Sequence, residues 1–131
     1  MERIDGGHDY YLNSYDGNWP QRLTFVKREG EGYPFNVGHH PGTNCQEVLR
    51  ALIDRVQYLQ RQIPCAANES VLTHLRLALR DFELRAALRH GRPLPAFDLD
   101  EIELQPTCEA CGHIGCNGKH RVGEVPPPPK M

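Results

Sequence analysis

Apolar side chains recur every three or four residues through the middle of the chain, and this periodicity constrains the fold more than any other feature. An i, i+3, i+4, i+7 spacing places side chains on one face of an α-helix, and a strand cannot accommodate it. The pattern therefore predicts an amphipathic helix of about five turns. Its apolar positions are Cys45, Val48, Leu49, Leu52, Ile53, Val56, Leu59 and Ile63.

Residues typical of helix ends delimit this first helix. Pro41-Gly42 interrupts the chain, and Thr43 with Gln46 three residues later matches the capping box T-x-x-Q. Pro64 cannot continue a helix, so it is expected to end this one. The sequence therefore predicts a helix from Thr43 to the residues just before Pro64.

A second helix is predicted after a short turn. Asn68 is the expected N-cap, and Glu69 lies against the positive end of the helix dipole. His90-Gly91 before Pro93 predicts the C-cap. The short loop forces the two helices of residues 43–92 to run antiparallel. The inner face of this helix is predicted to consist of Val71, Leu72, Leu75, Ala78, Leu79, Phe82 and Ala86.

The flanking regions show no such periodicity. Residues 1–42 are rich in aromatics and glycine, with one clear strand candidate at 22–27, a second extended stretch at 33–37, and turns elsewhere. Residues 93–131 are acidic and proline-rich and contain a Cys/His cluster. The predicted fold class is mainly α, an antiparallel two-helix hairpin with a short β or irregular N-terminal region and an irregular C-terminal tail.

The composition indicates a small core. Only 39% of residues are apolar, while 12 glycines and 11 prolines favour irregular structure. Two helices alone bury little surface, so oligomerisation or a metal ion is expected to add stability. Leu77, Leu84 and Leu88 fall on the outer side of the second helix. Scattered surface leucines are normal, but three in line favour contact with another copy of the chain.

Charge is distributed unevenly along the chain. Residues 43–92 hold eight arginines, no lysine and five acids, so this segment is +3 while the flanks sum to −5. The planar fork of arginine suits phosphate and also stacks on bases, which favours an anionic ligand. The alternative is a solvated face with helical ion pairs such as Asp81–Arg85 and Glu47–Arg50. Because the net charge of the chain is −2, a nucleic-acid partner is not expected.

The start of the first helix has the parts of an anion site. Free backbone N–H groups and the helix dipole combine there with Thr43 and Asn44. His40, just before them, could contact a ligand, although loop histidines are usually only solvated. Every capped helix has such groups, so the arginines are the stronger indication of an anionic ligand.

Cysteine and histidine cluster near the C-terminus in a pattern that can hold zinc. Three thiolates and one imidazole within so short a span can close tetrahedrally around Zn²⁺, in a structural site with no open position. The alternative is a flexible tail with free thiols. The four predicted ligands are Cys108, Cys111, Cys116 and His120.

Catalytic and membrane motifs are missing from the sequence. It contains no P-loop, G-x-S-x-G, H-E-x-x-H or paired-carboxylate motif, so we do not expect an enzyme. No apolar run reaches the length of a membrane span, and the N-terminus has no signal-peptide core. We expect a soluble cytoplasmic protein without a membrane partner.

Four segments together resemble the helical-hairpin domain of small phage proteins that counter the CBASS and Thoeris immune systems. They are the helix start Pro41-Gly42-Thr43-Asn44, the segment Leu49–Val56 with its Ile-Asp-Arg-Val motif, the turn Pro64–Glu69, and the closing Arg85–Arg92 (RAALRHGR). The resemblance covers about fifty of the 131 residues. It does not extend to the N-terminal third or to the Cys/His tail.

The resemblance implies a function as well as a fold. Proteins of that family pack their hairpins into hexamers and sequester cyclic oligonucleotide or cyclic ADP-ribose signals in the host cytoplasm. Carried over to this chain, the ligand-binding positions are Thr43, Asn44, Arg85 and Arg89. Tyr33 and Phe35, just before the hairpin, could stack on bases.

Two other functions are compatible with the sequence. One is a zinc-containing nucleic-acid-binding or regulatory module that uses the hairpin for dimerisation. The other is an assembly scaffold for a partner protein. A hexamer in solution favours the signal-binding protein, whereas a dimer favours the zinc module.

Overall fold

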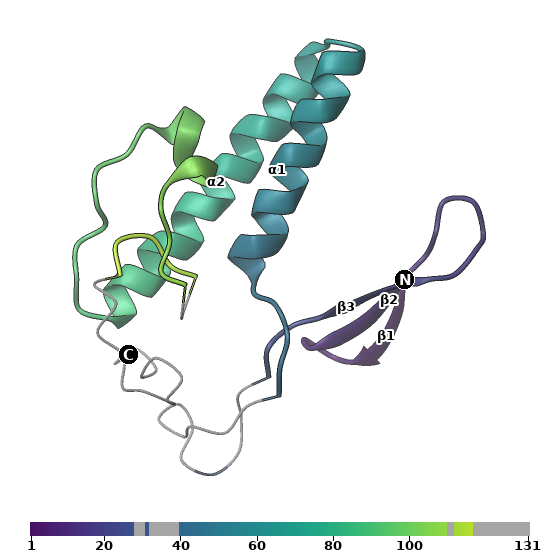
Figure 1. Ribbon diagram of the computed structural model, residues 1–131, viewed down its shortest axis with the longest axis horizontal. Helices are drawn as coiled ribbons and strands as arrows, with labels where there is room; N and C mark the ends of the chain where they lie inside the picture. The colour runs from purple at the N-terminus through teal and green to yellow at the C-terminus, as the bar shows by residue number, and fades with distance from the viewer. Residues whose placement is uncertain (28–30, 32–39, 110–111, 117–131) are drawn as a thin grey trace. The chain divides into compact units, whose positions relative to one another are not determined.

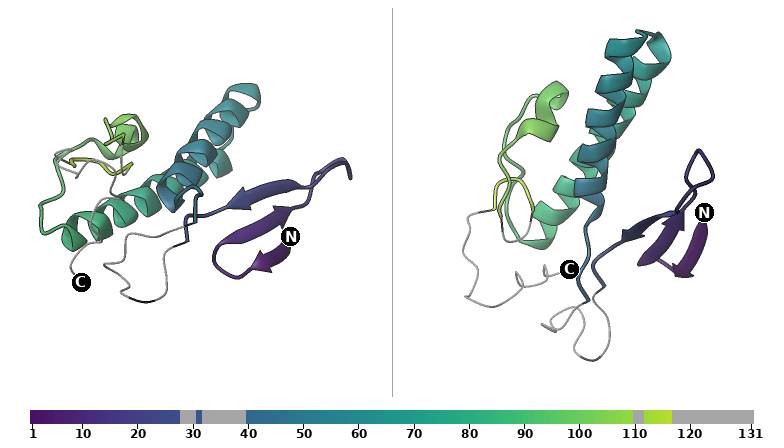
Figure 2. Two further views of the ribbon diagram at one scale, coloured as in Figure 1. Left: turned by 60° about the horizontal axis from the view of Figure 1, so that its bottom comes forward. Right: turned by 45° about the vertical axis from the view of Figure 1, so that its right-hand side comes forward.

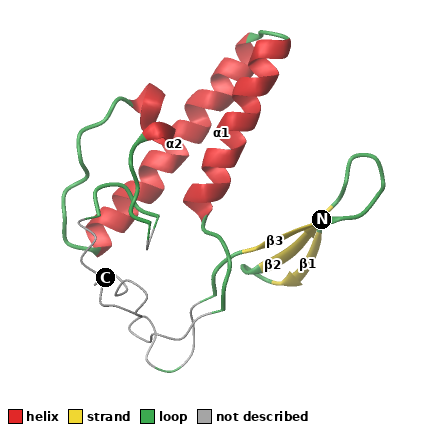
Figure 3. Ribbon diagram, viewed as in Figure 1, coloured by secondary structure: helices red, strands yellow, loops and turns green. Residues whose placement is uncertain are grey.

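The computed structural model describes residues 1–27, 31, 40–109 and 112–116 (Figure 1). These residues belong to two compact units, Met1–Asn44 and Cys45–Met131. The first unit contains the strands and the second contains the helices (Figure 3).

The first unit is built on a small antiparallel sheet. Its strands are β1 (Glu2–Asp5), β2 (Asp9–Leu12) and β3 (Gln21–Thr24), in the order β1-β2-β3. The turn between β1 and β2 contains Gly7 at φ +82°, a conformation that glycine adopts without strain. The rings of Tyr10 and Phe25 pack edge to face with centroids 6.1 Å apart.

The predicted strand at 22–27 is confirmed in part. Regular pairing covers Gln21–Thr24, and beyond it Phe25 and Lys27 make isolated bridges to Thr43 and His40. The strands β1 and β2 were missed because their short segments are half polar and carry little alternation. The second predicted extended stretch, 33–37, lies outside the described residues.

Gly42 is required by the close approach of two chain segments in this unit. Thr43 N donates to Thr24 O and Val26 N donates to Thr43 O, each at 2.8 Å. A Cβ on Gly42 would lie 2.5 Å from Val26 N, which no side chain could tolerate without a backbone shift. The Pro41-Gly42 break therefore serves the sheet-like pairing as well as preceding the helix.

The second unit contains the predicted hairpin. Helix α1 spans Cys45–Gln62, and α2 spans Ala66–Arg89. Three residues connect them, and the helices lie side by side and antiparallel in all views (Figure 2). The hairpin is confirmed, and His90 with Gly91 at φ +66° forms the predicted C-cap of α2.

Both predicted N-caps were wrong in position. Helix α2 begins at Ala66, two residues before Asn68, and its N-cap is Cys65, whose side chain makes no capping hydrogen bond. Alanine is the best helix former, so Ala66 and Ala67 extend the helix past the predicted start. Likewise α1 begins at Cys45, because the backbone of Thr43 is engaged in pairing with β3.

The core of the second unit includes residues that follow the hairpin. A short 3₁₀ helix, η1 (Leu99–Leu104), packs alongside α2. Ile102 on η1 is fully buried, and Ile114 is 2% exposed, in one cluster with Ile53 of α1 and Leu79 of α2. The expectation of an irregular tail was therefore incomplete, since its described part closes one side of the hairpin.

An ion pair holds η1 against α2. Arg76 Nε and Nη2 donate to the two carboxylate oxygens of Glu103 at 2.9 and 3.0 Å, and the side chains are only 14% and 8% exposed. This contact raises the pKa of Arg76 above its usual value. One arginine of the hairpin is thus structural.

The exposure of a few side chains at the edges of the helical faces differs from the prediction. Val71 and Ile63 were assigned to the inner faces, yet they are 42% and 76% exposed. The outer residues Leu84 and Leu88 are 41% and 69% exposed, as predicted, whereas Leu77 is half-buried.

None of the helices that the structure describes has the length and apolar character needed to cross a membrane.

Candidate functional site

The predicted ligand residues fall on both units. His40, Thr43 and Asn44 belong to the unit Met1–Asn44, whereas Arg85 and Arg89 lie on α2 of the other. Tyr33 and Phe35, the residues expected to stack on bases, lie outside the described residues. No described unit therefore holds the complete predicted site.

Arginine and histidine side chains gather at the base of the hairpin, where α1 begins and α2 ends. We call this group the basal cluster; it comprises Arg50, Arg89, His90, Arg92 and His113, and Arg50 pairs with Glu83. Its members come from three segments: α1, the end of α2 with its C-cap, and the turn around residue 113.

Glu83 is the buried anchor of the basal cluster. Its side chain has no exposed surface, although it is ionisable and lies on the core side of α2. Arg50 Nη2 donates to Oε1 at 3.2 Å, and the backbone N–H of Ile114 donates to Oε2 at 2.9 Å. Both carboxylate oxygens are therefore satisfied, as a buried charge requires.

Arg92 connects the same turn to the end of α2. Its Nη2 donates to the carbonyl oxygen of Ile114 at 3.1 Å. Ile114 thus donates its N–H to Glu83 and accepts at its C=O from Arg92, so its backbone is fixed on both sides. This arrangement positions the preceding His113 within the basal cluster.

His113 reports the electrostatic character of the basal cluster. Burial, followed by the positive charges of His90, Arg92, Arg89 and Arg50, lowers its pKa from 6.5 to about 4. Its ring lies against that of His90 with centroids 5.6 Å apart. The imidazole is therefore neutral at pH 7 because the surroundings are apolar and positive.

The basal cluster can bind an anion. Guanidinium groups from different segments converge there, and phosphate is the group that arginine binds best through paired N–H donors. Arg85, one turn before Arg89 on α2, is exposed and makes no hydrogen bond or ion pair with the described residues. It extends the positive surface outward.

Several hairpin arginines, Arg50 of the basal cluster among them, also make ion pairs or ring contacts on the helices, as the alternative interpretation of the charge pattern predicts. The predicted pair Glu47–Arg50 is confirmed at 3.1 Å. The predicted pair Asp81–Arg85 was wrong, because Asp81 instead accepts from the neighbouring Arg80 at 3.1 Å. Arg55 lies over the ring of Tyr58, 5.1 Å from its centroid.

Sequence reasoning selected Arg85 and Arg89 but missed Arg50, Glu83, Arg92 and His113. One signal was available: Glu83 stands four residues after Leu79 and three before Ala86, in the apolar register of α2. An acid in that register must meet a cation or a donor. Its partner Ile114 could not be inferred, because that contact spans 31 residues.

The predicted zinc ligands are described only in part. Cys108 and Cys116 are half-buried, whereas Cys111 and His120 lie outside the described residues. Cys108 N donates to His113 O at 3.0 Å, and Gly112 N donates to Cys108 O at 2.6 Å. Within the described ranges, no three Cys, His, Asp or Glu side chains are grouped closely enough to hold a metal ion.

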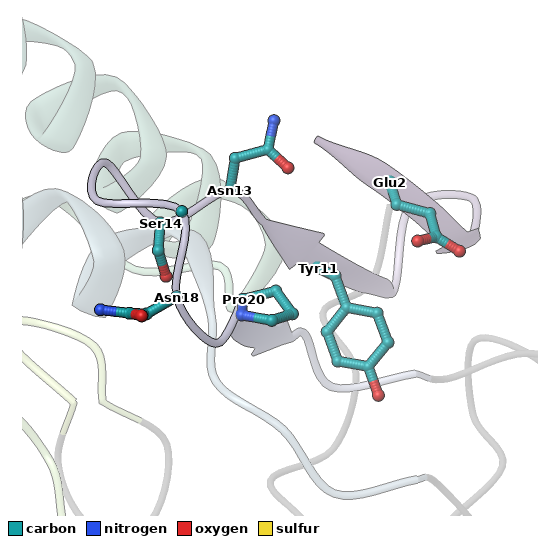
Figure 4. Close-up of a pocket in the computed structure, with 7 residues that line it drawn as sticks. Glu2, Tyr11, Asn13, Ser14, Asn18 and Pro20 are labelled. Carbon is teal, nitrogen blue, oxygen red and sulfur yellow. The ribbon is translucent and has the colours of Figure 1, made fainter.

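The first unit has a shallow hollow of ≈ 350 Å³ beside its sheet (Figure 4). Tyr11 of β2 and Glu2 of β1 line it together with the β2–β3 connection, which contributes Asn13, Ser14, Gly17, Asn18 and Pro20. Its only charged side chain is an acid, so it lacks the cations that a phosphate needs. We therefore place the candidate anion site in the basal cluster.

Comparisons with protein families, with curated proteins and with solved structures find no match for this chain.

Proposed function

We propose that this protein is a non-enzymatic, oligomeric binder of cyclic nucleotides. Its ligand would be a cyclic oligonucleotide or cyclic ADP-ribose-type signal, which it would sequester in the cytoplasm of an infected cell, as phage anti-defence proteins do. The observation that carries the proposal is the basal cluster, where Arg50 pairs with the buried Glu83 and the charges of Arg50, Arg89 and Arg92 act together on His113. The resemblance of residues 41–92 to that family supplies the ligand class.

A cyclic nucleotide requires cations for its phosphodiesters, planar groups for its bases, and a cavity that removes both from water. The basal cluster supplies the cations, and Arg85 adds one on the exposed side of α2. Guanidinium planes also stack on bases. These properties support a nucleotide over a simple polyanion, whose binding would need charge alone.

Self-association would enclose a ligand between copies of the chain. The outer side of α2 exposes Leu84 and Leu88, with Leu77 in line above them. Apolar side chains in a row on a helix usually meet a partner, and a second copy is the simplest one. A ligand pocket formed between copies would bring several basal clusters around one ligand.

A panel of ligands tests the proposal through thermal stability. The full chain is heated alone and with cyclic dinucleotides, cyclic trinucleotides and cyclic ADP-ribose isomers at about 100 µM. A ligand that binds only the folded state raises the melting temperature, and a linear dinucleotide of equal charge is the control. Equal shifts with the linear control, or none with any cyclic ligand, would refute the proposal.

We also propose that the tail binds one structural zinc ion through Cys108, Cys111, Cys116 and His120. The hydrogen bonds that join Cys108 to Gly112 and His113 keep this predicted ligand close to the residues that follow the cluster's second cysteine, which supports the proposal. A native mass spectrum should show one zinc per chain, lost on treatment with a chelator and in Cys108→Ser. Metal-free protein purified in the presence of zinc would contradict this proposal.

A further inference from the structure

The basal cluster contains buried nitrogen atoms that the rest of the described protein does not use. Arg50 Nε, Arg92 Nη1 and His113 Nδ1 are shielded from solvent and have no hydrogen-bond partner among the residues that the structure describes. Native proteins leave few such groups unsatisfied, because each costs free energy when it is removed from water. Bound water or a bound ligand usually completes them.

The two guanidinium groups are already held in place. Arg50 is fixed by Glu83 through Nη2 and by Glu47 through Nη1, and Arg92 is fixed by the carbonyl of Ile114. Only 14% of the Arg50 side chain is exposed. A ligand that bound their remaining N–H groups would not need to order these side chains, and such preorganisation favours affinity.

The charges around these atoms favour an anion. The basal cluster contains three guanidinium groups, those of Arg50, Arg89 and Arg92. The carboxylates that pair with Arg50 are those of Glu83 and Glu47. Glu47 is 54% exposed and therefore partly screened by water, so the interior of the cluster keeps an excess of positive charge.

We propose that Arg50 Nε and Arg92 Nη1, with His113 Nδ1 beside them, form a subsite for a single phosphate-type oxyanion. This inference deepens the proposed function, because it assigns one phosphodiester of the nucleotide to named atoms. A free phosphate ion offers the same oxygen acceptors as a phosphodiester, so the experiment tests phosphate and a cyclic nucleotide separately. Sequence reasoning placed the ligand at Arg85 and Arg89, whereas the subsite is formed by Arg50 and Arg92.

The experiment measures binding of inorganic phosphate and of a cyclic dinucleotide to the full chain and two variants. Arg92→Gln removes the second guanidinium and should weaken both ligands roughly tenfold. The matched control is Arg61→Gln, which removes an exposed arginine at the other end of the hairpin. In the unmodified protein, two-dimensional ¹H–¹⁵N spectra follow the Arg50 Nε–H resonance, so the test does not depend on the folding of a variant.

Three outcomes separate the subsite from the proposed function. Phosphate that shifts the Arg50 Nε–H resonance and binds Arg92→Gln more weakly supports the subsite, even where no cyclic nucleotide binds. A cyclic nucleotide that binds wild type and Arg92→Gln equally, without moving that resonance, overturns the subsite and leaves the proposed function standing. If neither phosphate nor nucleotide moves the resonance or the melting temperature, both are overturned.

Discussion

Glu83 is the residue on which the base of the hairpin is organised. It is fully buried, accepts from Arg50 and from the backbone of Ile114, and so connects α1, α2 and the turn near the C-terminus. A buried ion pair adds little net stability over an apolar pair, but breaking one side leaves an uncompensated charge. The role of Glu83 is therefore to specify how these three segments meet.

Replacing Glu83 by glutamine should destabilise the second unit. The substitution removes the buried anion of Arg50 and leaves only the exposed Glu47 beside its guanidinium, and the expected loss is about 3 kcal/mol of unfolding free energy. Urea denaturation followed by circular dichroism measures it, since α1 and α2 provide the signal. Glu101→Gln, an exposed change on η1, is the control and should be near neutral. Equal stability of the two variants would show that Glu83 is not the anchor.

The pKa of His113 should be about 4 in the folded protein. Because the unfolded chain holds its proton at the ordinary value of 6.5, the unfolded state binds more protons between these two values. The stability contribution is therefore complete above pH 6.5 and is lost as pH falls toward 4. Titration of the imidazole by NMR, with chelator present, measures the pKa directly.

Arg92→Gln tests whether the neighbouring positive charges lower the pKa of His113. It removes one of the positive charges beside His113 and should raise the pKa of that imidazole toward 6.5. Arg61→Gln, at the far end of the hairpin, should leave it unchanged. A wild-type value near 6.5 would mean that the turn around His113 does not pack on the basal cluster.

At the scale of elements, the sequence predicted the two helices well and their surroundings less well. Helical periodicity is strong in α1, where successive turns add apolar residues to the same face, and weaker in α2, where the outer leucines offset the inner face. The strands β1 and β2 are four residues each and gain their stability from pairing with β3. Such pairing depends on contacts between segments, which local sequence does not reveal.

The C-terminal segment illustrates the same limit. Ile102 lies in a short acidic stretch and Ile114 between histidine and glycine, so no extended periodicity marks them, yet both are core residues of the second unit. The basal cluster was predictable only as an excess of arginine near the end of α2. Its anchoring depends on Ile114, which the sequence placed in an irregular tail.

Ile102→Ala tests whether η1 belongs to the core. Removing a fully buried isoleucine leaves a cavity against α2, and the expected cost is about 3 kcal/mol of unfolding free energy. Leu104→Ala on the same element is the control, because Leu104 is 74% exposed. Thermal denaturation should show a large loss for the first and a small one for the second. Similar, small losses would place the segment outside the cooperative core.

For the molecule as a whole, the exposed leucines of α2 bear on assembly. If Leu84 and Leu88 pack against another copy, Leu88→Glu would bring a charge into that interface and should reduce the complex to the 14.9 kDa chain. Leu104→Glu changes an equally exposed leucine on η1 and should leave the mass unaltered. Light scattering on both variants measures this. A wild-type protein that is already monomeric would contradict the assembly proposal.

A native mass spectrum of the full chain incubated with cyclic dinucleotides, cyclic trinucleotides and cyclic ADP-ribose isomers tests the central claim most directly. It reports the number of chains and the bound ligands in one measurement. The proposed function predicts an oligomer that carries a cyclic nucleotide, and the subsite predicts in addition that Arg92→Gln loses ligand while Arg61→Gln keeps it. A spectrum without any nucleotide adduct at about 100 µM ligand would contradict the claim that the basal cluster binds such signals.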